Sequence, residues 1–160
     1  MNNKIWLSLL FIFPVTGFAQ GDIFFNKLQN AINDYSVKID VCTASRDEND
    51  LSTVGIKEIK NIVFKNPSVL SYLSEKAYNR CLQPERGNLA ETILYATTKD
   101  KTSPTFILAD STREISFHPD FSDEIIFNGL TAEQQQKLLS IDNLKNPFDA
   151  LKLMDRIMGE

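Results

Sequence analysis

The chain has 160 residues, with 17 basic and 21 acidic side chains, a net charge of −4 at pH 7 and one histidine. A nucleic-acid-binding protein of this size normally carries a surplus of Lys and Arg on one face, and the sequence has no such cluster. The length fits a single domain, and we expect no nucleic-acid partner.

Residues 1–19 have the pattern of a secretory signal peptide. Lys4 precedes an apolar run over residues 5–13, and small residues follow a proline up to Ala19, as signal peptidase requires. The run is shorter than the roughly 20 residues of a membrane-spanning helix. Cleavage after Ala19 would leave residues 20–160 as one soluble domain with a net charge of −5. We therefore expect a periplasmic or secreted protein without stable membrane insertion.

Cys42 and Cys81 are the only two cysteines. An even number of cysteines in an exported protein usually forms disulfides, and closing this loop would stabilise the fold by about 4 kcal/mol in the loop-entropy model. The two residues are too far apart in sequence to form a Cys-x-x-Cys redox site. We expect a structural disulfide.

Apolar residues at helical spacing dominate most of the chain. In the first helical segment, Val37, Ile39 and Val41 also alternate with polar residues, which leaves a short strand open there. Cys42 and Cys81 fall on apolar stripes, so their disulfide would join the first helix to the third. The expected helical segments are residues 22–44, the segment capped by Ser52 or Thr53, the segment after Asn66-Pro67, residues 88–98, the segment capped by Thr131, and the segment after Asn146-Pro147.

Residues 105–117 differ from the rest. Residues 105–109 and 114–117 are β-prone, and residues 110–113 between them are turn-like, which predicts a β-hairpin. The expected fold class is therefore α+β and predominantly α-helical, with about five helices, one β-hairpin near residues 105–117 and one disulfide.

The stretch after the hairpin is rich in large apolar residues. Irregular aromatic segments often form protein interfaces, although plain core packing is an alternative. Our candidate protein contact consists of Phe117, Phe121, Ile125, Ile126 and Phe127.

Catalytic and metal-binding patterns are weak. The single histidine, His118, stands beside Pro119 without a nucleophile motif, and no glycine-rich phosphate loop is present. Asp120, Asp123 and Glu124 cluster after the hairpin and could serve only as the carboxylate pair of a small hydrolase. We expect no catalytic residues, no metal and no cofactor.

Two short runs resemble known families. Residues 102–110, Thr-Ser-Pro-Thr-Phe-Ile-Leu-Ala-Asp, resemble the cis-proline strand of thioredoxin-like proteins, especially periplasmic disulfide isomerases of the DsbC type. The resemblance covers about residues 78–117 and implies a cis bond before Pro104. It also implies a redox-inactive or divergent relative, since the family's Cys-x-x-Cys is absent.

Residues 130–134, Leu-Thr-Ala-Glu-Gln, are similar to the Leu-Thr-x-x-Gln motif of the small helical Spy-type periplasmic chaperones. Those proteins carry the motif twice, whereas it occurs once here. The same residues also suit a helix start, with Thr131 as cap and Leu130 as a hydrophobic staple.

Taken together, these features predict an exported non-catalytic protein of the bacterial envelope that binds another envelope or secreted protein. Chaperones, inhibitors, immunity proteins and secretion accessories are of this type. The alternative is a redox-inactive or divergent thioredoxin-like periplasmic protein.

Overall fold

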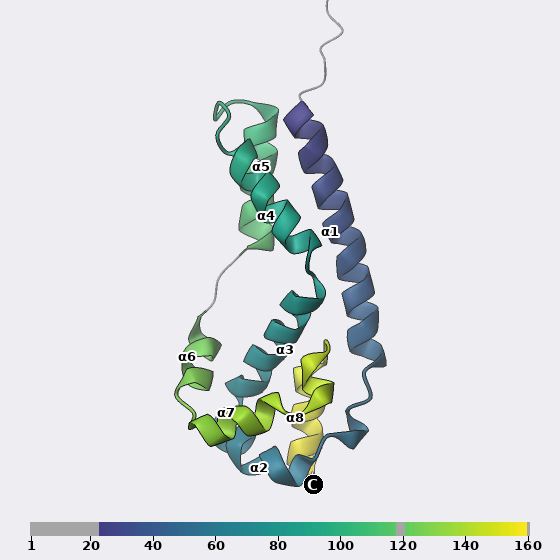
Figure 1. The fold of residues 1–160 in the computed structure, drawn as a ribbon, viewed down its shortest axis with the longest axis vertical. Coiled ribbons are helices and arrows are strands. Elements are labelled where there is room, and N and C mark those ends of the chain that lie inside the picture. The colour runs from purple at the N-terminus through teal and green to yellow at the C-terminus, as the bar shows by residue number, and fades with distance from the viewer. Residues whose placement is uncertain (1–22, 118–120, 160) are drawn as a thin grey trace, which may run out of the picture.

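The computed structural model describes residues 23–117 and 121–159, and the expected signal peptide up to Ala19 lies outside them. The described part is helical throughout (Figure 1). Its α-helices are α1 (Ile23–Glu48), α2 (Ile56–Lys65), α3 (Ser68–Cys81), α4 (Glu85–Ala96), α5 (Pro104–Ser116), α6 (Ser122–Asn128), α7 (Ala132–Leu139) and α8 (Ala150–Gly159), with 3-10 turns η1 (Leu51–Thr53) and η2 (Asp142–Lys145). None of these helices has the length and apolar character of a membrane span.

The expected α+β fold class is wrong, because the described residues form eight α-helices and no strand. The residues of the expected hairpin, 105–117, form α5. Ser103 caps this helix by accepting a hydrogen bond from the backbone N–H of Phe106 at 3.2 Å, and Pro104 follows at the first helical position. Thr105 and Ala109 lie one helical turn apart, and both are fully buried. The pattern of buried residues therefore has the period of a helix, although the β-propensity of these residues predicts a strand.

The turn-like residues in the middle of α5 also stay helical. The hydroxyls of Ser111 and Thr112 donate to the carbonyl oxygens four residues earlier, at 2.5 and 2.7 Å, and Arg113 pairs with Asp110 at 2.7 Å. In the described residues the only cis peptide bond precedes Pro84. The strand and the cis bond before Pro104 that the thioredoxin-like resemblance implies are therefore both contradicted.

The long first helix is confirmed as α1, which continues to Glu48 and shows no strand at residues 37–41. Helix α7 starts after its expected cap, Thr131, whereas α2 and α8 start a few residues later than expected, because their caps differ from those expected. Gly55 precedes α2. At α8 the carboxylate of Asp149 accepts hydrogen bonds from the backbone N–H groups of the next turn at 2.9 and 3.0 Å.

The molecule is elongated and has two hydrophobic cores (Figure 1). The upper core lies among α1, α4 and α5, and the lower core lies among α2, α6, α7 and α8. Helix α3 runs through both, so it is the axis of the fold. The upper core includes Leu28, Ala31, Tyr35, Cys42, Leu82, Leu89, Ile93 and Ala109, and the lower core includes Ile59, Val63, Leu70, Leu73, Phe127, Leu138, Phe148, Leu153 and Ile157.

Covalent and polar links hold α1 against the rest of the fold. The Cys42–Cys81 disulfide is confirmed and joins α1 to the end of α3, with the two Cα atoms 5.9 Å apart. Just beyond α1, the side-chain amide of Asn49 donates to the carbonyl oxygens of Asn143 and Pro147, both at 2.9 Å. The lower end of α1 is therefore tied to the segment that leads into α8.

Candidate functional site

The expected contact residues divide into buried and exposed groups. Phe127 is only 3% exposed, and its ring centroid lies 4.7 Å from that of Tyr72 in the lower core. In contrast, Phe121, Ile125 and Ile126 are 61%, 71% and 37% exposed. We call these three side chains the exposed α6 face.

Phe117 does not belong to this face. It caps the end of α5, stacks on Tyr35 with ring centroids 6.5 Å apart, and packs against the upper core. The guanidinium group of Arg86 lies 4.9 Å from its ring centroid. For Phe117 and Phe127 the core-packing alternative is therefore the one that the structure shows.

The sequence predicts an irregular stretch after residue 117, whereas the structure forms the helix α6 there. Its signals are Phe121 and Ile125 one turn apart, carboxylates in the first turn, and Gly129 at the C-terminal cap. The side-chain amide of Gln135, from α7, lies 3.1 Å from the carbonyl oxygen of Phe127 and 3.3 Å from that of Leu130. These contacts hold the end of α6 and fix the direction of the exposed face.

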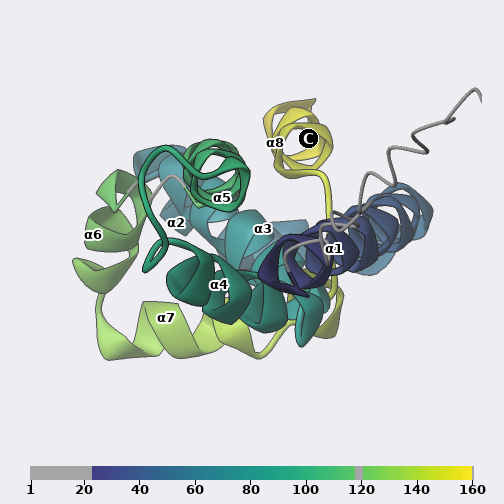
Figure 2. The ribbon, with the colours of Figure 1, turned by 90° about the horizontal axis from the view of Figure 1, so that it is seen from above.

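A shallow groove runs beside α6 along α3. We call it the α3 groove; four α3 side chains form its floor, α6 contributes one wall, and α1 and α8 contribute the other. In Figure 1, α6 lies to the left of α3 and α8 to its right, and in Figure 2 α8 lies above α3. The groove is lined by Arg46, Ser71, Ser74, Glu75, Tyr78, Asp123 and Ala150.

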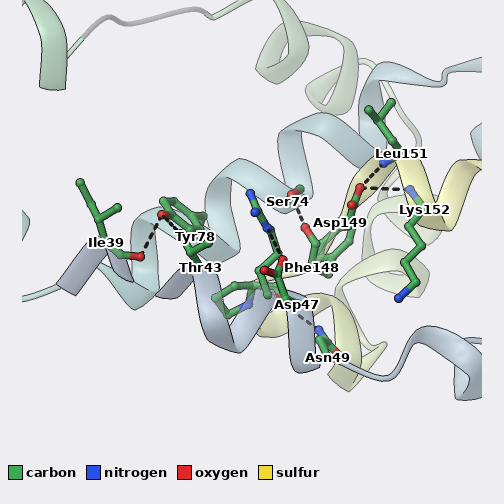
Figure 3. Close-up of polar contacts among 12 residues, drawn as sticks. Ile39, Thr43, Asp47, Asn49, Ser74, Tyr78, Phe148, Asp149, Leu151 and Lys152 are labelled. Carbon is green, nitrogen blue, oxygen red and sulfur yellow. Dashed lines mark hydrogen bonds and ion pairs between the residues drawn. The ribbon is translucent and has the colours of Figure 1, made fainter. Parts of the chain in front are cut away.

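Two polar groups of the groove floor are engaged in holding the fold (Figure 3). The Ser74 hydroxyl donates to the carbonyl oxygen of Phe148 at 2.6 Å. The Tyr78 hydroxyl lies 2.9 Å from the Thr43 hydroxyl and donates to the carbonyl oxygen of Ile39 at 3.3 Å. The floor is therefore cross-linked to α1 and to the segment before α8, which makes it a firm surface.

The charges at the groove are predominantly negative. Asp123 is half-buried on the wall and Glu75 is exposed on the floor. The cation that lines the groove, Arg46, pairs with the neighbouring Asp47 at 3.2 Å. No Lys or Arg occurs in the sequence between Arg113 and Lys137. The α6 side of the groove thus offers the carboxylate of Asp123 without a cation from its own chain segment.

Of the residues considered for catalysis, Asp123 and Glu124 lie in the described part. His118 and Asp120 lie outside the described residues. Asp123 lines the α3 groove whereas Glu124 does not. Among the described residues there is no cluster of three or more His, Cys, Asp or Glu side chains that could hold a metal ion.

Three surface aspartates have shifted pKa values. A hydrogen bond from the side chain of Ser52 lowers the pKa of Asp50, one from Thr102 lowers the pKa of Asp100, and one from Lys145 lowers the pKa of Asp142. None of the three lines the α3 groove. These carboxylates therefore bear on stability rather than on the candidate surface.

The Leu-Thr-x-x-Gln run has a local structural role. Thr131 accepts a hydrogen bond from the backbone N–H of Gln134 at 3.3 Å, and the Gln134 side chain accepts one from the backbone N–H of Thr131 at 3.0 Å, which confirms Thr131 as the cap of α7. Leu130 is buried in the lower core.

Comparisons with protein-family models, with curated proteins and with solved structures found no match to the chain.

Proposed function

We propose that this chain is an exported, non-catalytic protein that binds another protein of the bacterial envelope or secreted fraction through the exposed α6 face. The observation that carries the proposal is the division of α6 into two faces. Phe127 anchors the helix in the lower core, while Phe121 and Ile125 remain 61% and 71% exposed one turn apart. Apolar anchors on a firmly held element are typical of protein contact surfaces.

Single exposed apolar side chains are ordinary on protein surfaces, and Ile115 of α5 and Leu151 of α8 are examples, at 84% and 78% exposure. Val37 and Val41 of α1 form an exposed pair one turn apart, at 64% and 53% exposure. The α6 face groups three exposed apolar side chains within residues 121–126, on the helix whose Asp123 lines an open groove. This grouping supports a contact surface over chance exposure.

Export is supported by the signal-peptide pattern of residues 1–19 and by the Cys42–Cys81 disulfide, since disulfides persist mainly in oxidising compartments. The test is the intact mass of the exported protein after thiol alkylation, with and without reductant. We expect the mass of residues 20–160 and no alkylated thiol until reductant is added. A retained N-terminus or freely alkylated cysteines would overturn this part of the proposal.

The binding surface is tested by photo-crosslinking in cells. A photoreactive phenylalanine analogue replaces Ile125 on the exposed α6 face or, as a matched control, Val37 on α1, which has similar exposure. We expect a discrete protein adduct from position 125 that excess unlabelled protein competes away, and no such adduct from position 37. Identical adducts from both positions, or none from position 125, would contradict the proposal.

A further inference from the structure

We infer that the partner contacts this surface through a basic amphipathic segment, with its apolar residues on the exposed α6 face and its Lys or Arg side chains in the α3 groove. The inference rests on the proposed function and specifies the chemistry of the partner. It requires that the apolar face and the carboxylates be reachable by one segment, and that no cation of this chain already neutralise the carboxylates.

The first requirement follows from the positions of Asp123 and Ile126. Residues three apart on a helix are surface neighbours, whereas residues two apart are not. Ile126 therefore joins the exposed α6 face to the acidic wall of the groove, and Ile125 lies further round the helix. Asp123 lines the groove, while Ile126 is 37% exposed and Ile125 is 71% exposed. A segment lying over Ile126 therefore meets an apolar side chain and a carboxylate together, with Ile125 at its outer edge.

The second requirement concerns the cations nearest the groove. Lys76 of α3 lines a different, small pocket with Leu138 of α7, and it is not part of the groove lining. Its ammonium nitrogen lies 3.3 Å from the hydroxyl oxygen of Tyr72 and 6.0 Å from the ring centroid of Phe127. Arg46 is shared with Asp47. Glu75 accepts a hydrogen bond from the side-chain amide of Asn79 at 3.3 Å, and no ion pair within the described residues involves Glu75 or Asp123. Both carboxylates therefore remain available to an incoming cation.

Charge complementarity then selects the occupant. An apolar partner without charge would leave the half-buried Asp123 next to a dry interface, which is unfavourable for an unpaired carboxylate. A partner segment with Lys or Arg beside its apolar residues pairs these carboxylates and covers the apolar face at once. The net charge of −5 expected for residues 20–160 would also attract a basic segment at long range.

The test is fluorescence anisotropy with the disulfide-intact protein and three labelled peptides. The first is an amphipathic helix of leucine and lysine, the second has glutamate in place of lysine, and the third combines lysine with serine. We expect the leucine-lysine peptide to bind at least about tenfold more tightly than either of the others, because both the charge and the apolar contact contribute. We also expect added salt to weaken this binding.

Two double variants localise the binding. Glu75→Lys with Asp123→Lys reverses the groove charges, whereas Asp34→Lys with Glu91→Lys makes the same charge change in a separate groove between α1 and α4. We expect the groove variant to lose about tenfold in affinity for the leucine-lysine peptide or more, and the control to lose much less. Glu75→Gln with Asp123→Asn serves the same purpose if charge reversal prevents folding.

Equal losses in the groove and control variants would mean that net charge alone attracts the peptide, and would overturn the inference. Equal binding of the leucine-lysine and leucine-glutamate peptides would do the same. In both cases a specific adduct from position 125 would still uphold the proposed function, so the failure of the partner class is distinguishable from the failure of the surface itself.

Discussion

Replacing Phe127 by alanine is expected to destabilise the protein strongly, while the same replacement of Ile125, two positions earlier, should leave stability almost unchanged. Phe127 is 3% exposed and packs on Tyr72 at a ring-centroid distance of 4.7 Å, whereas Ile125 is 71% exposed. Truncating a buried phenylalanine typically costs about 3–5 kcal/mol, since both transfer free energy and cavity formation contribute. An exposed substitution usually changes the free energy of unfolding by about 0.5 kcal/mol or less.

The assay is urea unfolding of the disulfide-intact protein, followed by circular dichroism at the helical band. A loss of about 4 kcal/mol would remove a large share of the roughly 5–15 kcal/mol typical of a domain. A double-mutant cycle with Tyr72→Ala should in addition give a coupling energy of about 0.5–1.5 kcal/mol for the aromatic pair. Comparable losses for the two alanine variants, or a loss below about 1 kcal/mol for Phe127→Ala, would refute the division of α6 into a core face and an exposed face.

Three further predictions concern stability. Cys42→Ser should lower the free energy of unfolding by about 4 kcal/mol in the loop-entropy model, measured by urea unfolding, and reductant should then have no further effect. Asn49→Ala removes the hydrogen bonds from its side-chain amide to Asn143 and Pro147 and should cost about 1–3 kcal/mol in the same assay; an unchanged midpoint would contradict this link between α1 and α8. The hydrogen bonds from Thr102 lower the pKa of Asp100 below its ordinary value of 3.8, so the contribution of Asp100 to stability is complete above that pH and is lost as the pH falls through the lowered folded-state pKa. Asp100→Asn should therefore flatten the fall of the melting temperature in acid, and an identical pH profile would count against the Asp100 hydrogen bonds.

The surface proposed for binding depends on contacts from several elements. The ring of Phe127 packs on that of Tyr72 in α3, and the side-chain amide of Gln135 in α7 donates hydrogen bonds to carbonyl oxygens at the end of α6. These contacts leave the remaining apolar side chains of α6 exposed, and one of them, Ile126, is the helical neighbour of Asp123 at the α3 groove. Because the exposed α6 face is held in one orientation before binding, the binding of a partner would cost this protein little conformational entropy.

Some features of the fold followed from local sequence signals. The apolar stripe of α1, the Cys42–Cys81 disulfide between the first and third helices, and the Thr131 cap of α7 were all predicted, and the structure confirms them. Each of these features depends on interactions within a few residues or on the pairing of the only two cysteines, so each can be predicted from the sequence alone.

Other features depended on tertiary contacts. Residues 105–109 are locally β-prone, yet Ser103 and Pro104 start a helix there, and the burial of Thr105 and Ala109 one turn apart favours it. The exposure of Ile125 and the burial of Phe127 were likewise indistinguishable in the sequence, since both are large apolar residues of one short segment. Only the packing of α3 and α7 against α6 decides which side chain meets the core and which meets solvent, because burial is a property of the neighbours that a helix acquires in the folded chain.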